Sequence, residues 1–186
     1  MISTVTWDNQ ATLTNLTTIS LSRSIAVPSQ KVWAVISKPG HLADSHPFCQ
    51  QNPVEKWPGI GSKDEIYFYS GKIVHRDFYN WIDGEGYDLK LTVQDLDTHQ
   101  VDVKFRITSS SSTESESILT ITLTINALPN RTPWFVRRFI AHLITRPLLQ
   151  KYLDSVLKGY EYHITTGQPV KRNQFGSHFM FSPAVS

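Results

Sequence analysis

The stretch PWFVRRFIAHLITRPLLQKYLDSVLKGYEYHIT, residues 133–165, decides the fold. Its apolar residues recur at spacings of three and four, so one face of a long amphipathic helix must be buried. These positions form two runs, first Phe135, Phe139 and Leu143, and then Leu149, Leu153, Val156 and Tyr160. The strand-like sequence that precedes the helix supplies its expected partner, a bent antiparallel sheet. We expect a sheet bent around one helix to leave an apolar cavity on the order of several hundred Å³.

Bulk composition is that of one globular domain. The chain has 186 residues, of which 40% are hydrophobic and 18% are charged. A net charge of +2 lacks the basic excess that nucleic-acid binding requires, so no nucleic-acid partner is expected. The single cysteine, Cys49, excludes an internal disulfide and indicates a reducing, cytoplasmic compartment. We expect a flexible N-terminal segment at 1–16, one domain at 17–166 and a C-terminal tail at 167–186.

The order of elements predicts an α+β fold. A first strand over Thr18–Val27 is followed by two short helices, one from Ser29 and one from Leu42 to about Gln50. Alternating patterns then predict six strands: Val54–Trp57, Glu65–Tyr69, Lys72–Ile82, Gly86–Gln94, Val101–Thr108 and Ile118–Ala127. The sheet should therefore have six or seven strands. Within the last helix, Pro147 either makes a kink that could act as a gate or begins a second helix.

The turns predict which side chains face the cavity. A two-residue turn at 70–71 and a tight turn at 84–85 fix the pairing of the central strands. The candidate ligand-binding residues are then Tyr67, Tyr69, Arg76, Phe78, Asn80, Tyr87, Leu89 and Phe105 on the sheet, with Phe139 and Leu143 on the helix. One extra residue in the second turn would turn its strand over. His75, Asp77, Tyr79 and Trp81 would then face inward instead.

Arg76 is the charged residue on this otherwise apolar and aromatic wall. Its guanidinium could hold a ligand carboxylate or enolate through two parallel hydrogen bonds. The alternative is a structural ion pair with an acidic neighbour. The tyrosines carry the same ambiguity, because a strand tyrosine can belong to the core or can orient a ligand.

Other constellations are weak. His41, His46 and Cys49 match no zinc spacing, so no metal site is predicted. Asp44, Ser45 and His46 are adjacent in sequence, whereas a catalytic triad is assembled in space. The last helix has a basic face, which is either solvated or makes a transient contact with an anionic membrane. The basic residues are Arg137, Arg138, Arg146, Lys151 and Lys158.

Three segments carry a resemblance to a known superfamily. They are IAVPSQKVWAVI at residues 25–36, WPGIGS at residues 57–62 and the final helix. Together they resemble the START-like, helix-grip fold of the birch-pollen-allergen and polyketide-cyclase superfamily, SRPBCC, in an uncharacterised branch. The resemblance covers roughly residues 17–165. It implies binding of a lipid, quinone, hormone or polyketide, and in some members cyclisation or dehydration of a bound polyketide.

These observations favour a carrier of a hydrophobic or amphipathic small molecule, bound between the sheet and the last helix. Burial of apolar surface at about 25 cal/mol per Å² can supply micromolar affinity without specific chemistry. The alternative is an enzyme of the polyketide cyclase or dehydratase type, in which Arg76 and the tyrosines steady an enolate and a histidine moves a proton. No cofactor and no obligate protein partner are predicted, and the catalytic residues of the alternative stay unassigned.

Overall fold

The computed structural model describes residues 17–93, 100–109, 115–125 and 145–184. Its strands are β1 (Thr17–Ile25), β2 (Cys49–Gln51), β3 (Val54–Lys56), β4 (Lys63–Phe68), β5 (Ile73–Ile82), β6 (Gly86–Val93), β7 (Gln100–Ser109) and β8 (Ser117–Ile125). Its helices are α1 (Ser29–Ile36), α2 (Leu42–Ser45) and α4 (Arg146–Thr166). The N-terminal segment at 1–16 lies outside the described residues, as does the expected helical part at 133–144.

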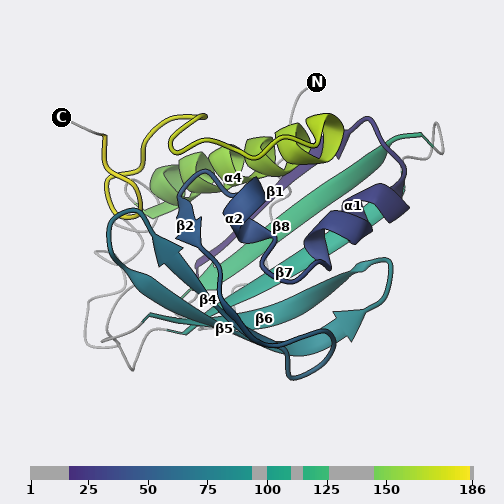
Figure 1. Ribbon diagram of the computed structural model, residues 1–186, viewed down its shortest axis with the longest axis horizontal. Helices are drawn as coiled ribbons and strands as arrows, with labels where there is room; N and C mark the ends of the chain where they lie inside the picture. The colour runs from purple at the N-terminus through teal and green to yellow at the C-terminus, as the bar shows by residue number, and fades with distance from the viewer. Residues whose placement is uncertain (1–16, 94–99, 110–114, 126–144, 185–186) are drawn as a thin grey trace.

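The strands form one antiparallel sheet in the order β1-β8-β7-β6-β5-β4-β2, with β3 also paired to β4. Figure 1 shows the sheet curving beneath α4, with α1 and α2 on the same side as α4. Helix α4 packs against β1 and α2. The bent antiparallel sheet gripped by a long C-terminal helix confirms the predicted α+β class.

The sheet has eight strands, one more than the sequence analysis resolved, because the second short helix ends early. Helix α2 stops at Ser45, and Cys49–Gln51 forms β2 instead of helix. Pro47 explains the difference. A proline disfavours helical backbone in the residue before it, and His46 is extended with φ −112° and ψ 116°.

Both predicted turns at the central strands are one residue too short. Between β4 and β5, Tyr67 pairs with Ile73, so the turn has an additional residue and Tyr67 lies on the outer face. The inner face of β4 instead carries Asp64, Ile66 and Phe68. The predicted inward placement of Tyr67 is therefore wrong.

Between β5 and β6, the additional turn residue is compensated by a β-bulge. Ile82 pairs with Gly86, and the register shifts between Phe78 and Asn80. Phe78 precedes the bulge and stays inside. Because a bulge changes which face the following residues occupy, Trp81 also turns inward. Asn80 moves away from the predicted inner face and donates a hydrogen bond to Asp88 at 3.0 Å.

Helix α4 contains Pro147 in its first turn, where the missing N–H costs little. Thr145, which precedes the helix, also has helical backbone, with φ −66° and ψ −46°. Because residues 126–144 lie outside the described ranges, the choice between a kink and a helix start at Pro147 stays a prediction. The helix ends at Gly167, which has φ 70° and donates from its N–H to the carbonyl of His163 at 2.8 Å.

The described part of the tail packs back onto the domain. Its backbone N–H groups at Val170 and Asn173 donate to Asp44 at 2.8 Å and to Pro47 at 3.0 Å. Figure 1 shows the tail, in yellow, running along α4 before it loops past β2. There Phe181 packs against Phe68 and Tyr152.

Candidate functional site

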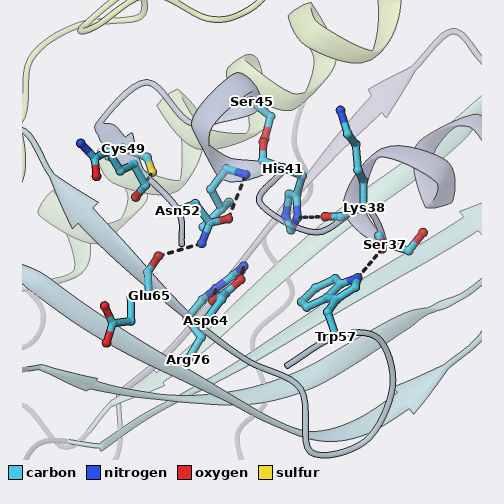
Figure 2. A network of polar contacts seen from close by, with 12 residues as sticks. Ser37, Lys38, His41, Ser45, Cys49, Asn52, Trp57, Asp64, Glu65 and Arg76 are labelled. Carbon is cyan, nitrogen blue, oxygen red and sulfur yellow. Dashed lines mark hydrogen bonds and ion pairs between the residues drawn. The ribbon is translucent and has the colours of Figure 1, made fainter. Parts of the chain in front are cut away.

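A buried ion pair lies on the inner face of the sheet. Arg76 on β5 stands directly opposite Asp64 on β4, and its Nε donates to Asp64 Oδ1 at 2.6 Å. Its Nη2 donates to the other carboxylate oxygen, which makes the pair bidentate. The side chains are 3% and 0% exposed. Figure 2 shows the pair beneath the segment that carries His41 and Asn52.

The structure therefore shows the alternative considered for Arg76, a structural ion pair with an acidic neighbour. Burial by itself would lower the pKa of the guanidinium, but the Asp64 carboxylate raises it, so Arg76 stays charged. Its Cζ atom also lies 5.1 Å from the centroid of the Phe78 ring. Contact of Arg76 with a ligand stays a prediction.

Tyr87 on β6 lies near the ion pair and is fully buried. Its ring stacks on Trp81 with centroids 5.5 Å apart and contacts Phe78 and Phe105 at 5.0 and 4.9 Å. Its hydroxyl has no hydrogen-bond partner among the described residues. Burial raises the pKa of Tyr87 well above its usual value, so the hydroxyl keeps its proton. A buried hydroxyl without a partner costs about 1–3 kcal/mol.

His41 and Tyr160 form a buried pair between α2 and α4. The Nδ1 of His41 lies 2.9 Å from the carbonyl oxygen of Lys38, which can only accept, so Nδ1 carries the proton. Its Nε2 is therefore the acceptor for the Tyr160 hydroxyl at 3.0 Å. Burial, together with the charge of Arg76, lowers the pKa of His41 well below its usual value.

His46 and Tyr152 form a second pair with the opposite tautomer. The backbone N–H of Phe48 donates to His46 Nδ1 at 3.2 Å, so the proton resides on Nε2. Nε2 donates to the Tyr152 oxygen at 3.0 Å. The hydroxyl hydrogen of Tyr152 therefore takes no part in this hydrogen bond. Burial lowers the pKa of His46 to about 3, with Arg76 adding to the effect.

Side chain to backbone hydrogen bonds hold α2 and the neighbouring loops over the ion pair (Figure 2). Asn52 accepts from the N–H of Leu42 at 3.3 Å and donates to the carbonyl of Glu65 at 2.7 Å. Trp57 donates from Nε1 to the carbonyl of Ser37 at 2.8 Å. These contacts join α1, α2 and β4. The interior polar cluster, defined as Asp64, Arg76, Tyr87, His41, Tyr160, His46 and Tyr152, is therefore supported from several elements.

The structure brings some of the predicted site residues together and separates others. Arg76, Phe78, Tyr87, Leu89 and Phe105 are buried on the inner face. Tyr67 and Asn80 lie elsewhere, as described above. Tyr69 contacts the tail, where the Cζ atom of Arg172 lies 4.8 Å from the centroid of the Tyr69 ring. Phe139 and Leu143 fall outside the described residues, and ligand contact by any of the ten residues stays a prediction.

Sequence reasoning missed the partners that complete the cluster. The mispredicted turn between β4 and β5 assigned Asp64 to the outer face. The observed register places Asp64 on the inner face together with Ile66 and Phe68. The sequence analysis considered His41 as a metal ligand, and His46 as a metal ligand and as a member of a catalytic triad. Their pairing with Tyr160 and Tyr152 depends on how α4 crosses α2, which periodicity does not reveal. Among the described residues, no group of three or more His, Cys, Asp and Glu is arranged to hold a metal ion.

An open groove of about 560 Å³ lies between residues of β1, α4 and the tail. It is lined by Arg23, Lys158, Glu161, Tyr162, Thr165 and Phe175. Arg23 and Lys158 are both ion-paired with Asp154, so the groove is crossed by internal charge pairs. The internal cavity and the membrane contact stay predictions. Within the described ranges, no helix is long and apolar enough to cross a membrane.

Comparison with known proteins identifies the fold. No family model matches the chain, and no curated protein matches it. A protein of unknown function from Staphylococcus aureus, SA2116, superposes with a TM-score of 0.64 at 9% identity, over 82% of this chain and 95% of that one. Ara h 8.0201 superposes with a TM-score of 0.58 at 13% identity, over 81% and 99% of the two chains.

Two further solved structures agree. A START superfamily protein from Mycobacterium smegmatis has a TM-score of 0.58 at 11% identity, over 81% of this chain and 99% of that one. DynU16, described as a putative protein in the dynemicin biosynthetic locus, has a TM-score of 0.59 at 13% identity. That match covers 82% of this chain, which spans about half of DynU16, 48% of its length. The chain therefore has the START-like, helix-grip fold.

Proposed function

We propose that this protein binds a hydrophobic or amphipathic small molecule, with the polar end of the ligand at the interior polar cluster. The observation that carries the proposal is the Tyr87 hydroxyl, which is fully buried beside a charged pair and lacks a partner among the described residues. Unpaired buried hydroxyls are rare because they lose their hydrogen bonds to water. A ligand oxygen would restore the missing bond.

The surroundings of Tyr87 suit the apolar part of such a ligand. Its ring lies among Phe78, Trp81 and Phe105. Aromatic walls with a few polar groups are the usual composition of small-molecule sites. Lipid-, quinone- and polyketide-like molecules all meet this description.

Native mass spectrometry of the purified protein tests the proposal. We expect a noncovalent adduct that organic extraction removes and that Tyr87→Phe binds at lower occupancy. Tyr79→Phe is the matched control, because Tyr79 is 45% exposed on the same sheet and reaches Asp102 at 3.4 Å. A protein that carries no adduct and takes up no lipid, quinone or polyketide probe would contradict the proposal.

The second candidate function is a polyketide cyclase or dehydratase. The observation in its favour is the His41–Tyr160 pair, which provides a titratable group beside the ion pair. A general base works best when its pKa lies near the working pH, whereas burial lowers the pKa of both His41 and His46. Binding without chemistry is therefore the stronger proposal. Conversion of a poly-β-ketone probe by the wild type, lost in Tyr160→Phe, would favour the enzyme.

A further inference from the structure

The interior polar cluster is unbalanced, because the Tyr87 O–H has no acceptor among the described residues. Arg76 has five N–H bonds, and Asp64 accepts two of them. Tyr87 retains its O–H, and the tautomer of His46 leaves the O–H of Tyr152 free of that pair. The carboxylate oxygens of Asp64 are already engaged by Arg76. A ligand that supplied an acceptor oxygen would correct this imbalance.

The cluster is also electrically balanced. The positive charge of Arg76 and the negative charge of Asp64 cancel within one bidentate pair whose side chains are 3% and 0% exposed. Neutral His41 and His46 add no charge, and the tyrosines keep their protons. A carboxylate brought to this position would add an uncompensated negative charge, which burial strongly disfavours.

We propose that the polar end of the ligand is an uncharged carbonyl oxygen, as in a ketone, ester or quinone, which accepts a hydrogen bond from the Tyr87 O–H. This inference rests on the proposed binding function and replaces the carboxylate considered from the sequence.

Binding of two probes with equal chain length tests the inference. The probes are a long-chain methyl ketone and the corresponding fatty-acid carboxylate, titrated into the full-length protein by calorimetry at neutral pH. The wild type should bind the ketone at least about tenfold more tightly, because only the ketone enters without adding charge. Tyr87→Phe should weaken ketone binding about 3- to 10-fold, the value of one neutral hydrogen bond, and Tyr79→Phe should not change it.

Asp64→Asn should reverse the preference between the two probes. The variant leaves Arg76 as an unpaired positive charge, so the carboxylate should now bind more tightly than the ketone. A buried unpaired charge also lowers stability. The carboxylate should therefore raise the melting temperature of this variant more than that of the wild type. If Asp64→Asn does not fold, the comparison of Tyr87→Phe with Tyr79→Phe still decides the role of the hydroxyl.

The possible failures are distinguishable. If neither probe binds the wild type, the proposed function is overturned together with the inference. Tighter binding of the carboxylate by the wild type would overturn the inference and leave the binding function intact. An equal loss for both probes in Tyr87→Phe would show that Tyr87 supports the fold and does not select the carbonyl.

Discussion

His41 and His46 stand at the two ends of α2, and each is joined to a tyrosine of α4. In one pair the tyrosine donates to the imidazole, and in the other the imidazole donates to the tyrosine. Both arrangements require a neutral ring, since a protonated imidazole has no acceptor nitrogen. The interior of the protein thus depends on two histidines staying uncharged.

This requirement predicts a stability that falls in mild acid. The folded pKa of His46 is lowered to about 3, that of His41 is also lowered, and both unfolded values are near 6.5. Below pH 6.5 the unfolded chain binds more protons than the folded one. The free energy of unfolding should therefore decrease by about 1.4 kcal/mol per pH unit for each histidine. Urea titrations between pH 7 and pH 5, above the range of ordinary carboxylates, measure this slope.

His46→Gln should reduce the slope by about one proton. His75→Gln is the control, because His75 lies on the outer face beside Glu65 with its side chain 43% exposed. A free energy of unfolding that stays constant from pH 7 to pH 5 would contradict the burial of neutral histidines.

At the scale of elements, α4 and α2 meet at Gly159. A Cβ atom at this position would overlap the carbonyl oxygen of Ser45 and lie 3.0 Å from Cδ of Pro47. The glycine therefore permits the close approach that brings Tyr160 to His41 and Tyr152 to His46. Backbone contact at a helix crossing is a common reason for glycine inside a helix.

Gly159→Ala should consequently destabilise the protein. Alanine normally stabilises a helix interior by about 1 kcal/mol relative to glycine. Here the overlap with α2 costs about 1–3 kcal/mol, so we expect a net loss of up to about 2 kcal/mol in urea unfolding. Gln150→Ala, at an exposed position of the same helix, should change the value by less than about 0.5 kcal/mol. A gain in stability for Gly159→Ala would show that the two helices do not meet there.

The strand registers show where sequence reasoning stops. Alternation along β5 places Arg76 and Phe78 on one face, and the structure confirms it. The same pattern does not reveal the bulge between Phe78 and Asn80 or the longer turn after Tyr67. Both depend on local backbone geometry that several sequences can adopt. Arg76 was placed correctly because the bulge compensated the misjudged second turn.

For the whole molecule, the order of elements was enough to predict the fold, since a sheet followed by one long amphipathic helix has few ways to bury both apolar faces. The site was only partly predictable. Arg76 and Tyr87 follow from strand alternation. Asp64 requires the exact turn length, and the two histidine pairs require the crossing of α2 and α4, which is a tertiary contact between segments distant in sequence.

Amide hydrogen exchange should reproduce the order of the sheet. Strands β6, β7 and β8 have partners on both sides, whereas β3 has three residues and pairs only with β4. We expect the amides of Leu89, Val103 and Leu123 to exchange only through global unfolding. Those of β3 should exchange by local opening at much higher rates. Equal protection in β3 and β7 would contradict the strand order.

The pairing of β1 with β8 has a consequence for how the molecule assembles. Thr18 and Thr124, which face each other across this pair, are 106 residues apart in the chain. Closing a loop of that length costs about 4 kcal/mol of chain entropy before any contact is gained, by (3/2)RT ln n. Until β8 has formed, Ile19 and Ile25 have no strand to cover them. Folding should therefore be slow for a protein of this size, and the first strand in the sequence should be the last to join the sheet.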